Sequence, residues 1–337
     1  MRRCLVTLIA VAGSARGAAA QPADGGSPAG GASHAASPRV PGPAAASAPT
    51  DAAPVTPAAP IRNPRDATLG ELFRGPFPSA RLFAMPSADV VGAYMLSLSG
   101  DASLLDRPGV LTSAGVIAVG FGDIAQLEYR HTEAIGVTGL DAPVPAVGVQ
   151  LKLPIPERSG VPAIGVAFRL GVPRSETVDG RTVDETVTDL YFVGRLRFAS
   201  VPWLTLHGGT RISSAKAEPS DARLARQATL WLPTAGYEVA MTSRARIVGE
   251  IALAPQFQWL PVADAGPTIG RGVLGRLGIR WRILPAIVVD GSLGYQVDDA
   301  APTAGFDAVV TWDIRLGAEV FVPWGALACR AVGVFCN

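Results

Sequence analysis

The sequence predicts an all-β fold, namely a membrane-spanning antiparallel up-and-down β-barrel of about 12 strands that follows a disordered N-terminal extension. Three observations lead to this prediction. Apolar and polar residues alternate over stretches of ten or more residues, and the connections between these stretches are alternately long and short. After the N-terminus, no run of about 18 apolar residues occurs that would form a transmembrane helix.

The alternation is clearest in the C-terminal part of the chain. From Val273 to Ile283 every second residue is apolar or glycine, whereas three arginines lie among the residues between them. Successive side chains of a strand point to opposite faces of a sheet, so one face is apolar and the other is charged. The same pattern returns over residues 287–297 and 308–320. These three segments are therefore predicted to be strands of a barrel wall.

Twelve segments of this kind can be recognised. They are Val90–Leu98, Val110–Phe121, Ile124–Arg130, Ala146–Leu153, Ala163–Val172, Asp189–Phe198, Trp203–Ile212, Trp231–Met241, Arg244–Trp259, and residues 273–283, 287–297 and 308–320. Short connections such as Gly122-Asp123 and Thr242-Ser243 alternate with long ones such as Ser213–Leu230. An even number of strands with long outer loops and short periplasmic turns is typical of bacterial outer-membrane barrels.

Composition narrows the class of protein. The chain has 337 residues, a formal net charge of +1 and 48% hydrophobic residues. A charge this close to zero gives no support for binding to nucleic acid. High apolar content without a transmembrane helix fits a barrel, in which only every second residue faces lipid.

The residues before the first strand divide into three parts. Residues 1–20 begin with the arginines at positions 2 and 3, continue with a short apolar core and end in small residues, which predicts a secretory signal peptide rather than a buried strand. Residues 21–65 are rich in Pro, Ala and Gly, which predicts a disordered linker that acts as a spacer or contacts the cell wall. Residues 66–88 form a short pre-barrel segment, which could plug the barrel or cover its periplasmic rim; we favour the rim.

The barrel is predicted to occupy residues 89–322, and a tail of residues 323–337 follows it. Cys329 and Cys336 are the cysteines that remain after removal of the signal peptide. In an oxidising compartment they could form a disulfide that closes a small loop, or they could stay as two thiols.

These features together resemble Gram-negative outer-membrane β-barrel proteins of the porin-like class, over Asp89 to Phe321. The resemblance is one of architecture. It implies an integral location in the outer membrane, with both termini in the periplasm. It also implies contact with outer-membrane lipid and with the machinery that inserts barrels; the sequence leaves the oligomeric state open. The alternative is a soluble sandwich or barrel whose apolar faces point inward.

The polar faces of the strands identify the residues that would line a lumen. The candidates are Arg130, Lys152, Arg169, Arg195, Arg197, Arg211, Glu250, Arg276, Arg280, Arg282, Asp290, Asp313, Arg315 and Glu319. Basic residues outnumber acidic ones, so an open pore would favour anions. Alternatively, the same charges could pair across strands and fill the interior. The arginines at 276, 280 and 282 mark the expected constriction.

No motif for an enzyme, a cofactor or a metal site stands out. His131 and His207 lie in the predicted barrel, but no spacing places either of them in a catalytic arrangement. We therefore expect no enzyme activity and no cofactor. The predicted function is a porin-like channel for the passive passage of small solutes through a mildly positive lumen. The alternatives are a non-conducting structural or anchoring barrel and, with less support, an outer-membrane hydrolase.

Overall fold

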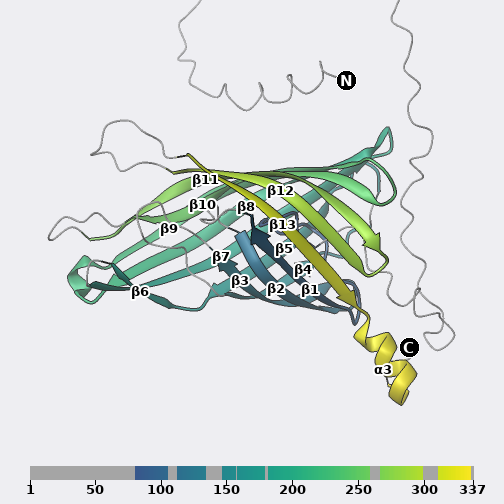
Figure 1. Ribbon diagram of the computed structural model, residues 1–337, viewed down its shortest axis with the longest axis horizontal. Helices are drawn as coiled ribbons and strands as arrows, with labels where there is room; N and C mark the ends of the chain where they lie inside the picture. The colour runs from purple at the N-terminus through teal and green to yellow at the C-terminus, as the bar shows by residue number, and fades with distance from the viewer. Residues whose placement is uncertain are drawn as a thin grey trace, which may run out of the picture. The chain divides into compact units, whose positions relative to one another are not determined.

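The computed structural model is a closed antiparallel β-barrel of 12 strands (Figure 1). The structure describes residues 80–104, 112–133, 146–156, 158–178, 181–258, 266–298 and 310–334. The ring closes where β1 (Leu96–Ser103) pairs with β13 (Val310–Val322). The fold class predicted from the sequence is confirmed.

Neighbouring strands follow one another around the wall in chain order. They are β2 (Thr112–Phe121), β3 (Ala125–Glu133), β4 (Ala146–Lys152), β5 (Ala163–Gly171), β7 (Arg181–Phe198), β8 (Val201–Pro219), β9 (Arg226–Ala240), β10 (Ala245–Gln258), β11 (Thr268–Leu284) and β12 (Ile287–Asp298). The short strand β6 (Arg174–Val178) shares the edge of β7 with β5, so the 13 strands of the sheet occupy 12 positions in the wall.

Several of the predicted strand boundaries differ from the structure by five residues or more. The first strand, predicted at Val90–Leu98, begins at Leu96, because Val90 and Val91 are buried away from the wall. Strands β7 and β8 extend far into segments that were predicted to be loops, and with β6 they project beyond the neighbouring strands (Figure 1). The extension was not predicted because several of its inward residues, such as Val183 and Ala217, are small or apolar, although the inward residue Glu185 is charged.

Short connections gather at one end of the barrel. They join β2 to β3, β7 to β8, β9 to β10, and β11 to β12, and we call this end the short-turn end. Chain direction alternates around an antiparallel ring, so β13 also ends here. The helix α3 (Trp324–Val332) follows it directly. The described residues contain no helix long and apolar enough to cross a membrane.

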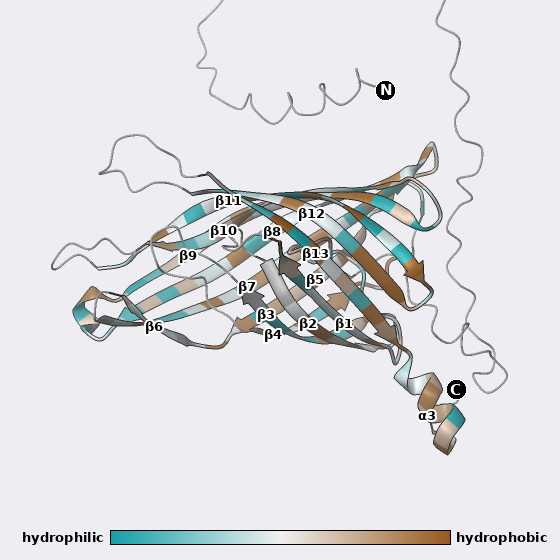
Figure 2. Cartoon of the chain, viewed as in Figure 1, coloured by the Kyte–Doolittle hydropathy of each residue, from teal (hydrophilic) through white to brown (hydrophobic). Residues whose placement is uncertain are grey.

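The two faces of the wall differ sharply in polarity. On β11, Leu277, Ile279 and Trp281 are 51%, 52% and 55% exposed, whereas Arg276 and Arg280 between them are 3% and 4% exposed. Hydrophobic and hydrophilic residues alternate in this way along the strands (Figure 2). The apolar side chains therefore face out and the charges face in. This is the arrangement of a barrel that spans a lipid bilayer, and it is the reverse of a soluble barrel.

Residues 80–91 lie inside the barrel, and we call them the plug segment. Leu82 and Ala88 are completely buried, and Met85 is 2% exposed. The segment turns back on itself, since the backbone N–H of Leu82 donates to the carbonyl of Met85 at 2.9 Å. The favoured placement of residues 66–88 on the rim is therefore wrong for its described part, which fills the lumen.

Tyr94 lies between the plug segment and β1, and it packs against the start of the C-terminal helix. Tyr94 lies in the left-handed backbone region, with φ of 54°. Its ring packs edge-on against Trp324 at 5.5 Å between centroids, and its carbonyl accepts from the N–H of Gly325 at 3.1 Å. A side chain at residue 325 would collide with Tyr94, so Gly325 lets the start of α3 lie directly on this tyrosine.

The orientation of the wall can be tested with two substitutions on β11. Leu277→Arg places a charge on the outward face in the middle of the strand, which costs about 2–4 kcal/mol in a bilayer. Ile283→Arg makes the same change near the short-turn end and is expected to cost about 0–1 kcal/mol. Urea unfolding of both variants in lipid vesicles measures the difference. Equal destabilisation by the two substitutions would contradict the orientation.

Candidate functional site: the occupied barrel lumen

The plug segment turns at residues 81–85, which we call its tip. One carboxylate of the wall binds this tip. Glu250, in the middle of β10, accepts hydrogen bonds from three successive backbone N–H groups. The distances from its oxygens are 2.9 Å to Phe83 N, 2.9 Å to Ala84 N and 3.2 Å to Met85 N. Glu250 is 5% exposed, so the three amides replace the water that its charge would otherwise need.

Arginines of the wall bind the carbonyl oxygens of the same tip. Arg280 donates to the carbonyls of Arg81, at 3.2 Å, and of Leu82. Arg130 donates to the carbonyl of Ala84 at 3.1 Å, from the side of β3. The tip is thus held by β3 on one side of the ring and by the neighbouring strands β10 and β11 on the other.

The arginine row that was predicted to form the constriction is in contact with the plug segment. The guanidinium carbons of Arg276 and Arg280 lie 5.9 Å and 5.7 Å from the centre of the Phe83 ring. Such cation–π contacts are favourable in a site from which water is excluded. The space beside β11 is therefore occupied by an aromatic side chain.

Residues 87–91, which we call the second limb of the plug segment, are bound to β3, β4 and β7. Gln150 donates to the carbonyls of Ser87 and Asp89 at 2.8 Å and 2.5 Å. The carboxylate of Asp89 pairs with Arg195, and its other oxygen lies 3.4 Å from the ammonium of Lys152. Asp89 thus supplies the plug segment with one negative charge, placed between two cations of the wall.

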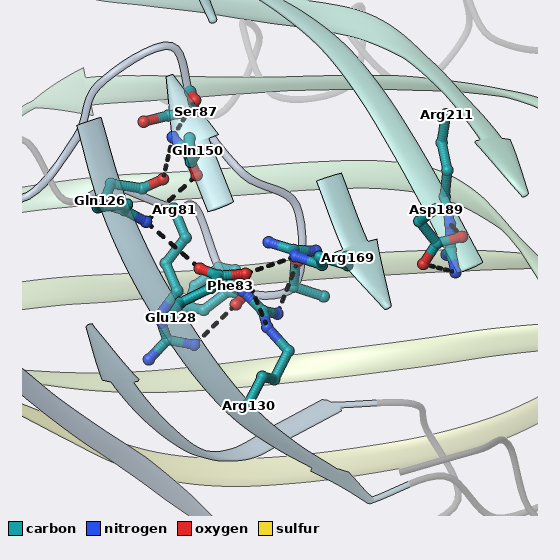
Figure 3. A network of polar contacts seen from close by, with 12 residues as sticks. Arg81, Phe83, Ser87, Gln126, Glu128, Arg130, Gln150, Arg169, Asp189 and Arg211 are labelled. Atoms are coloured by element: carbon teal, nitrogen blue, oxygen red, sulfur yellow. Dashed lines mark hydrogen bonds and ion pairs between the residues drawn. The ribbon is translucent and has the colours of Figure 1, made fainter. Parts of the chain in front are cut away.

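Further charges pair within the wall itself. The carboxylate of Glu128 lies 2.6 Å from Nε of Arg169, and that of Asp189 lies 2.7 Å from Nη2 of Arg211 (Figure 3). On β13, Arg315 pairs with Asp313 and with Asp101 of β1. A buried guanidinium is tolerated only when a carboxylate or other acceptors surround it, which explains why acidic residues accompany the arginines.

An apolar cluster narrows the interior toward the end opposite the short turns. It is formed by Val183 and Val187 of β7, Ala215 and Ala217 of β8, and Phe257 of β10. Val183, Ala215 and Ala217 are completely buried. The described lumen is therefore filled at two levels, by the plug segment and by this cluster.

The candidates from the sequence all lie on strands, and most of their side chains are buried. Arg130, Arg169, Arg195, Glu250, Arg276, Arg280, Asp313, Arg315 and Glu319 are each at most 5% exposed. Lys152, Arg197, Arg211, Arg282 and Asp290 are half-buried. Their role as pore-lining residues stays a prediction, because the described lumen is occupied.

Several important residues lay outside that set. Asp89 and the wall amides Gln126 and Gln150 were not singled out, and a plug formed by residues 66–88 was considered only as the less favoured alternative to the rim. The signal that could have found the plug segment is a short apolar run, from Leu82 to Met85, which lacks the alternation of a strand and follows Gly/Pro-rich sequence.

Of the two cysteines in the tail, the structure describes only Cys329. Cys329 is completely buried in α3 and is disulfide-bonded. Its predicted partner, Cys336, lies outside the described residues, as do residues 1–79, so that pairing, the signal peptide and the linker stay predictions. His207 is buried beside Glu238, with 3.3 Å between Nε2 and Oε1. In the described residues, no group of acidic, His and Cys side chains is arranged to hold a metal ion.

An apolar outer wall around a charged interior decides the class of fold. The chain has the fold of an outer-membrane β-barrel. No protein-family model matches it, and no curated protein matches it. Solved structures with similar architecture do exist, and each of them is an outer-membrane barrel.

The translocator domain of autotransporter NalP from Neisseria meningitidis is 13% identical, with a TM-score of 0.39, over 67% of this chain and 86% of that one. The NanC porin is 9% identical, with a TM-score of 0.37, over 68% and 99%. The anion-selective porin from Comamonas acidovorans is 10% identical, with a TM-score of 0.31, over 63% and 59%. None of these similarities bears on the function of this chain.

The role of Glu250 can be tested by Glu250→Gln. The neutral side chain keeps one acceptor, but it turns an amide group toward backbone donors, so the tip should detach more often. Hydrogen exchange at the amides of residues 83–85 is expected to become at least about tenfold faster. Asp189→Asn, which removes a buried carboxylate that pairs within the wall, is the matched control. Unchanged protection in Glu250→Gln would show that this carboxylate does not hold the tip.

Proposed function

We propose that this barrel is a gated channel for small anionic solutes, held closed by the plug segment in the state described here. The short-turn end and both termini would face the periplasm, because barrels of the outer membrane have their short turns on that side. We propose no catalytic role for the residues of the lumen, so the chain would not be an enzyme.

The observation that carries the proposal is that the plug segment takes the place of anions. Its carbonyl oxygens accept hydrogen bonds from Arg130 and Arg280, and the carboxylate of Asp89 pairs with Arg195 and Lys152. If the segment moved out, these four cations would face water. A water-filled lumen with such a lining attracts anions and repels cations.

Many contacts of the plug segment are of a kind that water can replace. It is held by hydrogen bonds and ion pairs as well as by buried apolar side chains, of which Leu82, Phe83 and Met85 cluster with Val248 of the wall. A hydrogen bond to a charged group contributes about 1.5–3 kcal/mol when it is intact, so loss of a few anchors changes the open population by orders of magnitude.

A second candidate function is a non-conducting structural barrel. The apolar cluster around Phe257 favours it, because this cluster narrows the interior independently of the plug segment. In such a barrel, release of the plug segment would not create a path for ions.

Recordings in planar lipid bilayers distinguish the two functions. The double variant Asp89→Asn/Glu250→Gln removes the two carboxylates through which the plug segment and the wall are joined. It should open far more often than the wild-type protein. In a gradient of KCl, the reversal potential of the open channel should show preference for chloride.

Asp189→Asn serves as the control and is expected to conduct no more than the wild type, because Asp189 binds Arg211 and Ser213, which belong to the wall. If neither the double variant nor the same variant with Phe257→Ala conducts, the barrel is structural and the channel proposal is wrong. Preference for potassium would contradict the proposed selectivity.

A further inference from the structure

A cavity of about 300 Å³ opens at the short-turn end of the barrel. It lies between the connection that precedes β5 and the adjoining ends of β7, β8, β9 and β10. This cavity is separate from the tip of the plug segment, which is bound near the middle of β10 and β11. Its size is at the lower end of the range for small-molecule sites.

The cavity is strongly positive. Its described lining includes the four arginines 158, 195, 197 and 246 and one acidic residue, Glu238, which leaves a net charge of 4 − 1 = +3. The acidic residue is already engaged, since Glu238 binds Arg246 at 2.5 Å and lies 3.3 Å from His207. The potential inside the cavity therefore attracts anions.

Apolar side chains complete the lining. Val161, Phe198 and Trp203 border the cavity together with the arginines. An organic ligand can place its carbon skeleton against these surfaces while its charged groups meet the guanidinium groups. Guanidinium groups match carboxylate and phosphate oxygens through paired hydrogen bonds. The lining thus suits a small organic anion better than a bare halide ion.

One arginine connects the cavity to the plug segment. Arg195 borders the cavity, and its Nη1 also donates to the carboxylate of Asp89. A ligand carboxylate that binds Arg195 would therefore compete with Asp89 for the same guanidinium. Weaker binding of Asp89 loosens the second limb of the plug segment.

We propose that this cavity binds a small organic anion bearing carboxylate or phosphate groups, through the arginines at 158, 195 and 197. The bound anion displaces Asp89 from Arg195 and so favours release of the plug segment. The binding site stands on its own, whereas the effect on opening rests on the proposed channel function. By linkage, the ligand and Asp89 each weaken the binding of the other.

Calorimetry on the full-length protein in detergent tests the binding site without any measurement of conductance. Succinate and inorganic phosphate are the probes, and succinamide is the neutral equivalent of succinate. Succinate or phosphate should bind, and succinamide should not. Arg158→Gln/Arg197→Gln, which leaves Arg195 and its contact with Asp89 intact, should weaken binding by about tenfold or more.

Arg223→Gln, in the 3-10 helix Ala222–Leu224 between β8 and β9, is the matched control and should bind as the wild type does. The site is overturned if succinamide binds as well as the anions, if neither anion binds, or if the double arginine variant keeps its affinity.

Asp89→Asn tests the competition separately. Removal of the competing carboxylate should tighten binding of succinate by about threefold to tenfold. Unchanged affinity in Asp89→Asn would overturn the coupling. Anion binding in a barrel that never conducts would disprove the channel and leave the site standing, whereas conductance without anion binding would do the reverse.

Discussion

The state of the lumen depends on the Glu250 carboxylate and the three backbone amides that surround it. A buried carboxylate is costly unless donors replace its water, and here the donors come from a segment outside the wall. The same turn presents its carbonyls to Arg130 and Arg280. The plug segment and the wall therefore supply each other's hydrogen-bond partners. If they separated, water would have to take the place of the missing partners.

The remaining interior follows the same rule with wall residues alone. Glu128 lies among Arg169 and Arg130, and Asp189 is bound by Arg211 and Ser213. The exterior is apolar between the strand ends, so the charged side chains there point to the inside, where the low dielectric makes unpaired charges costly. Positive residues of the wall exceed negative ones, and the plug segment supplies several of them with acceptors, namely the Asp89 carboxylate and backbone carbonyls. Its own Arg81 balances the charge of Asp89, so the segment adds acceptors but no net charge.

Asp89 and Arg195 connect the two proposals. The pair is at once an anchor of the plug segment and part of the lining of the positive cavity. A ligand at the short-turn end would thus act on the plug segment through one guanidinium, with no movement of the wall. A rigid, hydrogen-bonded barrel is suited to such a device, because the moving part is a short segment held by replaceable contacts.

The sequence by itself determined the barrel, the direction in which its faces point and the charged character of its interior. Period-two alternation is a local property, and the side chains from Val273 to Ile283 leave a strand on fixed faces whatever their neighbours are. Only the tertiary structure decided that residues 80–91 fill the lumen, that Glu250 anchors them, and that Arg195 joins plug segment and cavity. These contacts link residues more than a hundred positions apart and depend on the closed ring, about which local periodicity carries no information. The extended ends of β7 and β8 were missed for a related reason, because several of their inward residues pack on Phe257 of β10 and are therefore apolar.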